Sequence, residues 1–242
     1  FCLSSYIHFP EFKNTSTFSR TLLPLDVMLK TIDELSEINT RALNFTGGGD
    51  PTVNPNLREV LYYTKENTLI KMGMFTNGAL LDKFDLFDAV VDSLEWVRIS
   101  VDAGTKESYD WIRQIRADDG WDKMIDNLGI LIEAKTKRNS NTTIGVGFVI
   151  TEDTKDDIVN FAKVFSEFDV DYCQYKTDCV NLSRWDEGYE RNVELFDYIK
   201  DDLDEATKIL GDKFQCKYNG IEDIKVGAEH TNHYKKCLGS QI

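Results

Sequence analysis

The sequence predicts an α/β protein built on one sheet of parallel strands that are connected as repeated βα units. Short apolar runs of strand length alternate with longer segments of helical period, and this alternation is typical of repeated βα units. Glycine and polar residues follow the strand ends, where ligands bind in barrels built from such units. The chain has 242 residues, 41% of them hydrophobic, which is enough for one large domain.

The elements follow one another in a regular order. Five strands are predicted, over residues 41–47, 69–78, 96–104, 142–150 and 171–178. Helical periodicity and capping residues predict helices over residues 54–67, 80–92, 105–115, 121–139, 153–168 and 188–210. Asn54 or Asn56 is expected near the N-cap of the first of these helices. The polar tail from 211 to 242 predicts no regular element, so we expect one domain over 1–185 and a helical and irregular segment over 186–242.

Charge and composition exclude several classes of function. The chain carries 28 basic and 42 acidic residues, a net charge of −14, which opposes binding to nucleic acid or anionic lipid. No apolar run reaches the roughly 20 residues of a membrane span, and no signal peptide opens the chain. We therefore expect a cytoplasmic protein without a nucleic-acid or membrane partner. The odd number of cysteines, 5, favours reduced thiols or metal ligands over disulfides.

The stretch "LNFTGGGDP" places three glycines and an acid after the first predicted strand. Glycine leaves the backbone open to close contact with a ligand. Phosphate-binding patterns, GxxxxGK[ST] and GxGxxG, are absent from the sequence. Asp50 beside bare backbone suits a cationic group such as the ammonium of an amino acid. The alternative is a sharp turn that Asp50 merely shapes.

A second group of residues follows the third predicted strand. Ser100 ends that strand and Arg113 lies on the next helix, so a hydroxyl and a guanidinium could converge on a carboxylate. Each also has an ordinary interpretation, as a strand-end serine and a surface arginine. Together, an ammonium site and a carboxylate site at one rim describe an amino-acid moiety.

Five blocks of sequence, in order over about residues 1–178, resemble the radical SAM enzymes. "FTGGGDP" resembles their GGE-type motif, "MFTNG" their TNG turn, and "VRISVDAGTKESYDWIR" their ribose and carboxylate segment. "IGVGFVITEDT" resembles the strand that borders adenine, and the opening "FC" resembles the end of CxxxCxΦC.

The resemblance implies a partial (β/α)6 TIM-like barrel with a 4Fe-4S cluster and S-adenosylmethionine (SAM). Cys2 would be the third cluster ligand. The SAM-binding residues implied are Gly48, Gly49 and Asp50 for the amino group, Ser100 and Arg113 for the carboxylate, Asp102 for the ribose, backbone around Val149 and Tyr175 for the adenine, and Asn77 of the TNG turn. Asp50 occupies the position of the glutamate in the family's GGE-type motif, and its side chain is shorter but has the same charge.

The resemblance also implies an activity. The reduced cluster would cleave SAM to a 5′-deoxyadenosyl radical, which would take a hydrogen atom from a peptide or a small molecule such as a sugar or alcohol. An electron donor such as flavodoxin or ferredoxin would supply the electron. No catalytic acid or base can be assigned from the sequence. The family's first strand and two of its three cysteines have no counterpart here, so we expect an incomplete N-terminal part.

Cys237, in "HYKKCLGSQI", resembles the first cysteine of SPASM or twitch extensions, which hold an auxiliary iron–sulfur cluster. The resemblance predicts that this C-terminal extension is incomplete as well, and the alternative is a lone cysteine in a tail. Cys173 alternates with apolar residues and is expected in the core. His230 and His233 could share a helical face and bind metal, but a solvated tail is the simpler interpretation.

Two other functions fit the sequence. One is a non-catalytic barrel that binds a nucleoside as a partner subunit. The other is a metal-independent aldolase-like enzyme, which needs a Schiff-base lysine at a strand end. Lys176 in "QYKTD" is the lysine so placed.

Overall fold

The computed structural model describes residues 22–46, 49–113, 119–177 and 185–217, without the side chains of 177, 185–194, 196 and 217. This part of the chain forms a sheet of six strands in the order β1-β2-β3-β4-β5-β6, and every neighbouring pair is parallel. The strands are β1 (Ala42–Phe45), β2 (Lys71–Thr76), β3 (Trp96–Ser100), β4 (Thr143–Ile150), β5 (Tyr172–Thr177) and β6 (Phe214–Lys217). The predicted α/β fold with a partial, open barrel is confirmed, since β1 and β6 remain as two unpaired edges of the described sheet.

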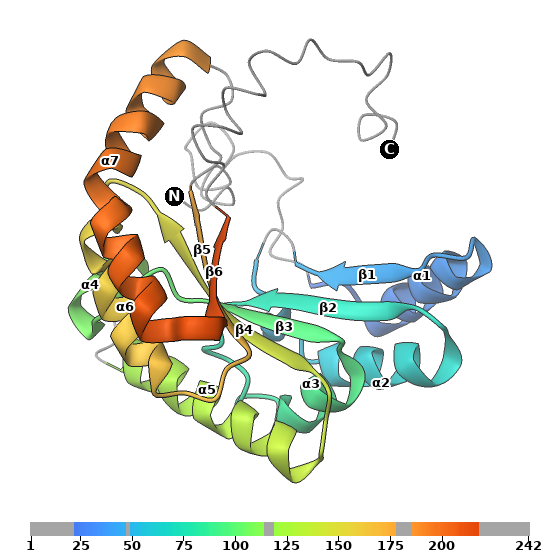
Figure 1. Ribbon diagram of the computed structural model, residues 1–242. Coiled ribbons are helices and arrows are strands. Elements are labelled where there is room, and N and C mark those ends of the chain that lie inside the picture. Colours follow the sequence, from blue (N-terminus) through green and yellow to red (C-terminus); the bar gives the residue numbers. More distant parts are fainter. Residues whose placement is uncertain (1–21, 47–48, 114–118, 178–184, 218–242) are drawn as a thin grey trace.

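Helices connect the strands and lie along one side of the curved sheet (Figure 1). The α-helices are α1 (Leu25–Glu37), α2 (Leu57–Asn67), α3 (Phe87–Ser93), α4 (Lys106–Arg113), α5 (Gly120–Lys137), α6 (Ile158–Ser166) and α7 (Trp185–Leu210). Short 3-10 turns are η2 (Pro51–Val53), η3 (Lys155–Asp157) and η4 (Gly211–Lys213). Asn56 is the N-cap residue of α2, one of the two positions predicted.

The hydrophobic core lies between the sheet and these helices. Successive side chains of a strand point to opposite faces, and in β4 the residues Ile144, Val146, Phe148 and Ile150 are fully buried. An aromatic cluster continues the core toward α6, with the ring of Phe148 5.0 Å from Phe161 and 5.4 Å from Tyr175. The other face of each strand, which we call the inner face, carries half-buried and polar side chains such as Arg98, Gln174 and Lys176.

The helix predicted over 80–92 is only partly correct, because α3 begins at Phe87. The preceding segment forms turns, with Asp85 at a φ of 49°. Leu81 and Leu86 on either side are completely buried, and Arg58 donates to the Asp85 carbonyl at 2.9 Å. Burial of two leucines thus overrides the local helical period.

Two elements were not predicted, α1 and β6. The tail was expected to be irregular from residue 211, yet Phe214–Lys217 pairs with β5 as a sixth strand. Four residues of mixed polarity give almost no sequence signal. Pairing with β5, and the packing of the Phe214 ring 5.4 Å from Tyr175, supply the stabilisation instead. Because α7 also packs on α6, residues 185–217 extend the same sheet and helix layer.

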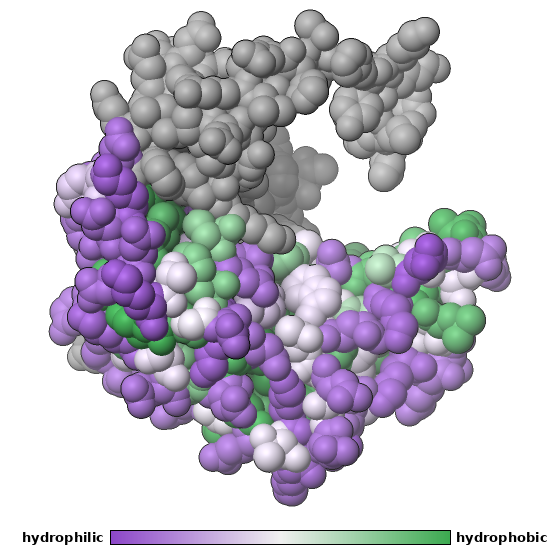
Figure 2. All heavy atoms as spheres, in the orientation of Figure 1, coloured by the Kyte–Doolittle hydropathy of each residue, from purple (hydrophilic) through white to green (hydrophobic). Residues whose placement is uncertain are grey.

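The described helices contain none long and apolar enough to cross a membrane. Hydrophilic residues cover most of the face seen in Figure 2, and hydrophobic ones gather at α1, where Leu23 and Val27 are exposed.

Candidate functional site: the C-terminal rim of the sheet

The loops that follow the strands meet at one edge of the sheet, because all strands run parallel. Residues 47–48 lie outside the described part, as do Cys2, Cys179, Cys237, His230 and His233. The structure therefore describes the rim residues from Gly49 onward.

Asp50 links the loop after β1 to the turn after β2. Its carboxylate accepts hydrogen bonds from the Thr52 backbone N–H at 3.0 Å and the Thr52 hydroxyl at 2.5 Å. It also accepts from the Thr76 hydroxyl at 2.8 Å and the Asn77 backbone N–H at 2.6 Å. A carboxylate offers about four acceptor positions, so Asp50 is largely occupied by the protein itself. The turn-shaping role is thus present, whereas contact with a ligand ammonium remains a prediction.

Hydrogen bonds and a glycine conformation fix the TNG turn after β2. The Asn77 side-chain carbonyl accepts the Ala79 N–H at 2.9 Å. Gly78 has a φ of +76°, in the region that favours glycine, and the Asn127 amide donates to its carbonyl at 2.8 Å. The backbone of Asn77 is therefore fixed beside Asp50, and its amide oxygen is committed to the turn.

Ser100, Asp102 and Arg113 lie together after β3, and their contact with a ligand remains a prediction. The Arg113 Nη2 atom donates to the Ser100 carbonyl, to the Asp102 carboxylate at 2.8 Å and to the Val101 carbonyl at 3.3 Å. It is thus the backbone of Ser100 that Arg113 contacts. Among the described residues, the buried Arg113 Nε atom has no hydrogen-bond partner, so one donor of this guanidinium is left for a ligand.

Asp102 is almost completely buried, with 3% of its surface exposed. One carboxylate oxygen pairs with Arg113 and the other accepts the Val149 N–H at 2.8 Å. Burial raises the pKa of Asp102, and Arg113 and the Val149 N–H oppose that rise. Both oxygens are occupied, so this acid ties the loop after β3 to β4.

The two residues predicted beside adenine lie in different environments. The Val149 N–H is bound to Asp102, and its carbonyl accepts the Thr154 hydroxyl at 2.7 Å. The Tyr175 side chain is fully buried in the aromatic core, its hydroxyl donates to the Ile158 carbonyl at 2.8 Å, and burial raises its pKa. A contact between adenine and the backbone near either residue remains a prediction.

Sequence reasoning missed Asp157, on the turn before α6. Its carboxylate accepts the Gly104 N–H and the Ser108 hydroxyl. A Cβ at Gly104 would lie 2.3 Å from the Phe161 backbone nitrogen, so the loop after β3 packs directly on α6. The glycine in "DAG" was the available signal, because close backbone approach requires it.

The cysteines of the described part do not form a cluster site. Cys173 is in the core as predicted, and burial raises its pKa to about 12. Cys216 lies exposed on β6. Within the described ranges, no group of three or more His, Cys, Asp or Glu side chains is arranged to hold a metal ion.

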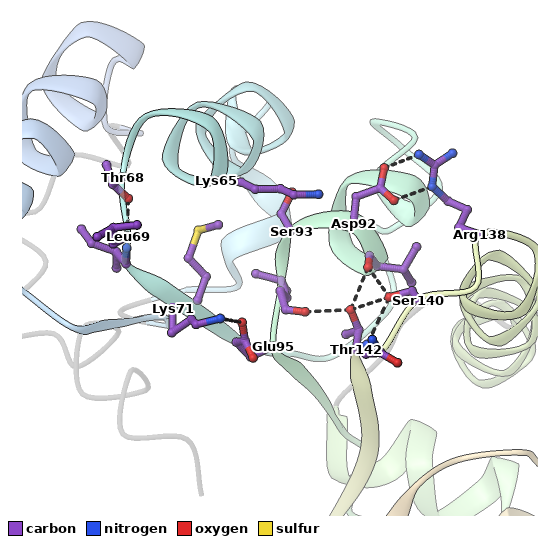
Figure 3. Close-up of a pocket in the computed structure, with 15 residues that line it drawn as sticks. Lys65, Thr68, Leu69, Lys71, Asp92, Ser93, Glu95, Arg138, Ser140 and Thr142 are labelled. Carbon is purple, nitrogen blue, oxygen red and sulfur yellow. Dashed lines mark hydrogen bonds and ion pairs between the residues drawn. The ribbon is translucent and has the colours of Figure 1, made fainter.

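A cavity of about 500 Å³ lies at the opposite edge, near the N-terminal ends of β2, β3 and β4 (Figure 3). Four of its charged residues form two ion pairs. Lys71 meets Glu95 at 2.6 Å, and Arg138 Nε donates to Asp92 at 2.6 Å. Since this cavity is remote from the C-terminal ends of the strands, we assign it no part in the chemistry.

Comparison with known proteins identifies a family model that matches the chain, and proteins that are similar to part of it. The family model for the radical SAM superfamily matches residues 1–163. "GTPase Obg" of Brachyspira hyodysenteriae (strain ATCC 49526 / WA1) is 30% identical over 119 residues, which cover 48% of this chain and 17% of that protein. The chain therefore spans a small part of that relative, and it has no GxxxxGK[ST] motif for binding nucleotide phosphates.

Two solved structures are similar in fold. Streptococcus suis SuiB has a TM-score of 0.57 and 15% identity, over 90% of this chain and 48% of that chain. Archaeal TYW1 has a TM-score of 0.47 and 17% identity, over 74% of this chain and 66% of that chain. The chain thus spans about half of SuiB, and that likeness concerns the fold alone. Because the family model covers 163 of the 242 residues, the chain belongs to the radical SAM superfamily.

Proposed function

We propose that this chain is a radical SAM enzyme that removes a hydrogen atom from a peptide or small-molecule substrate. The proposal depends on one observation: the family-like motifs lie together at the C-terminal rim of the sheet. Three motifs that resemble those of the family follow successive parallel strands, and two carboxylates link them. Asp50 joins the first motif to the second, and Asp102 joins the third to β4.

The rim has features that suit the amino-acid end of SAM. A Cβ at Gly49 would meet nothing within 4 Å, so this backbone is open to a ligand. The buried Nε of Arg113, which has no partner in the part of the chain that the structure describes, is a donor for a carboxylate. We propose that backbone at Gly48 and Gly49, with Asp50, binds the amino group, and that Ser100 and Arg113 bind the carboxylate.

The contacts of Asp102 support a different role from the one expected. An acid that already binds Arg113 and the Val149 N–H has little capacity left for ribose hydroxyls. We propose that Asp102 positions Arg113, and that Asn77, Val149 and Tyr175 contribute backbone to the nucleoside side of the site.

When bound, a 4Fe-4S cluster and SAM would supply the one-electron chemistry of the reaction. Cys2 is the proposed thiolate ligand in this sequence. An auxiliary cluster at Cys237 and electron transfer from a flavodoxin or ferredoxin are further parts of the proposal. The protein orients the bound groups and keeps water from them.

The test uses the full-length protein, reconstituted with iron and sulfide without oxygen. Visible absorption of an iron–sulfur cluster, and cleavage of SAM on reduction, measured by mass spectrometry, are the expected results. SAM affinity should fall in Arg113→Gln and stay unchanged in Arg58→Gln, a surface control paired with Asp85. SAM binding without a cluster would instead favour a non-catalytic nucleoside-binding subunit and overturn the enzymatic proposal.

A further inference from the structure

Two basic side chains on the inner face of the sheet have no acidic partner among the residues that the structure describes. They are Arg98 on β3 and Lys176 on β5. Several other cations are paired with acids, such as Lys135 with Asp171 at 2.6 Å and Lys71 with Glu95 at 2.6 Å. Unpaired charge inside the curve of the sheet is unexpected in a chain with a net charge of −14.

The strand register places these two residues on one face. Gly147 of β4 pairs with Ser100 on one side and with Gln174 on the other. Arg98 lies two residues before Ser100 on β3, and Lys176 lies two residues after Gln174 on β5. Because side chains two residues apart on a strand point to the same face, both share the inner face with these partners. The structure thus brings to one surface two residues that are 78 positions apart in the sequence.

Two glycines of β4 make room for large side chains from the neighbouring strands. A Cβ at Gly147 would lie 3.3 Å from Cδ of Arg98, and one at Gly145 would lie 2.1 Å from the Tyr172 ring. Arg98 and Tyr172 therefore extend across β4 toward each other's strand.

Arg98 is held in place but its charge is not neutralised. It donates to the Gln174 side-chain carbonyl, and its guanidinium lies 4.4 Å from the centre of the Phe75 ring. Burial lowers the pKa of Arg98, yet a guanidinium stays charged in proteins. A partly desolvated cation without a counter-charge is costly, and a bound anion would remove that cost.

The nearby acid does not supply the missing charge. Arg98 and Lys176 both act electrostatically on Asp102, which is already paired with Arg113 at 2.8 Å. Arg98 and Lys176 therefore add positive charge near Asp102, whose own charge is matched by Arg113. The Lys176 ammonium has no hydrogen bond or ion pair within the described part, which leaves its three donors available.

We propose that Arg98 and Lys176 bind an anionic oxygen group of the substrate, a carboxylate or a phosphate, on the inner face of the sheet. The inference rests on the proposed function, since it takes the ligand to be the substrate of the same barrel. Arg98 precedes Ser100 by two residues, roughly 6.6 Å along the strand, so it lies below the rim residues proposed for SAM. This assigns Lys176 an electrostatic role rather than that of a Schiff-base nucleophile.

Isothermal titration calorimetry of the full-length protein at low ionic strength tests the proposal. The probes are inorganic phosphate and succinate, with succinamide as the uncharged counterpart of succinate. The variants are Arg98→Gln and Lys176→Gln, and Lys163→Gln on the exposed surface of α6 is the matched control. We expect one of the anions to bind, and each inner-face variant to weaken that binding by about tenfold or more, as for loss of a charge-assisted hydrogen bond.

The probe that binds more tightly identifies a phosphate or a carboxylate as the recognised group. Equal affinity in wild type and Lys176→Gln, or no binding of either anion beyond that of succinamide, would overturn the proposal. If circular dichroism shows that Arg98→Gln does not fold, Lys176→Gln decides alone.

The same preparation is tested for SAM binding, which separates the two proposals. Protein that binds SAM but neither anion overturns only this inference. Protein that binds an anion at these residues but neither iron nor SAM overturns the proposed function and leaves the anion site standing.

Discussion

Asp102 and Arg113 form an ion pair of 2.8 Å in which 4% of the acid side chain and 24% of the arginine side chain are exposed. The same aspartate accepts the Val149 N–H, so a single carboxylate connects α4, the loop after β3 and strand β4. Asp102 has a φ of 61°, a left-handed conformation that Asp tolerates better than most residues. This pair therefore sets the position of the guanidinium that we propose for SAM.

Replacement of Asp102 by alanine should destabilise the protein strongly. It leaves Arg113 without its acid and the Val149 N–H without its acceptor, and breaking a buried pair costs roughly 3–5 kcal/mol. The measurement is the free energy of unfolding in urea. Glu95→Ala, which removes the exposed partner of Lys71, is the control and should cost about 1 kcal/mol or less. Equal losses in the two variants would contradict a structural role for the buried pair.

The pH dependence of stability should reveal the burial of Asp102. Its pKa is raised above the ordinary 3.8, so the folded state binds this proton more tightly than the unfolded state. The contribution of Asp102 is then fully present below pH 3.8 and is lost as the pH rises through the raised pKa. Asp102→Asn cannot titrate at this position. The stability of wild type relative to Asp102→Asn should therefore decrease as pH increases from about 3.8, and an increase would show that Arg113 outweighs burial.

Thr76→Val tests whether Asp50 and the TNG turn act as one unit. The Thr76 hydroxyl donates to Asp50 at 2.8 Å and accepts the Gly78 N–H at 3.1 Å. Its loss leaves buried polar groups unsatisfied, at a cost of about 1–3 kcal/mol. We expect this loss of stability together with a lower affinity for SAM in equilibrium dialysis. Thr136→Val, at an exposed hydroxyl of α5, should change neither, and unchanged SAM affinity in Thr76→Val would argue against the coupling.

Gly104→Ala should prevent the loop after β3 from packing on α6. The added Cβ would lie 2.3 Å from the Phe161 nitrogen and 2.6 Å from the Asn160 carbonyl carbon, and backbone atoms cannot move aside easily. We expect a loss of several kcal/mol, about the range of other severe packing substitutions. Gly129→Ala, inside α5 with nothing within 4 Å, should instead stabilise the protein by roughly 0.5–1 kcal/mol. Similar melting temperatures for the two variants would contradict the close approach at Gly104.

The alternation of apolar strands and amphipathic helices was enough to predict the parallel sheet and most of its order. It placed β1 to β5 within a few residues, because buried strands bounded by glycine and polar residues leave a strong local signal. The same reasoning put Asp50, Asn77, Ser100 and Asp102 at one rim, since the ends of parallel strands must meet there.

Only the tertiary structure decided how these residues are used. β6 exists because the edge of β5 and the ring of Tyr175 stabilise it, and neither is near Phe214 in the sequence. Three hydrogen bonds show this. Asp50 and Thr76 are 26 positions apart, Asp102 and Val149 are 47 apart, and Arg98 and Gln174 are 76 apart. Local sequence patterns do not reveal which donor and acceptor will form a hydrogen bond when they are this far apart in the sequence. The register between strands and the packing of side chains determine these partners.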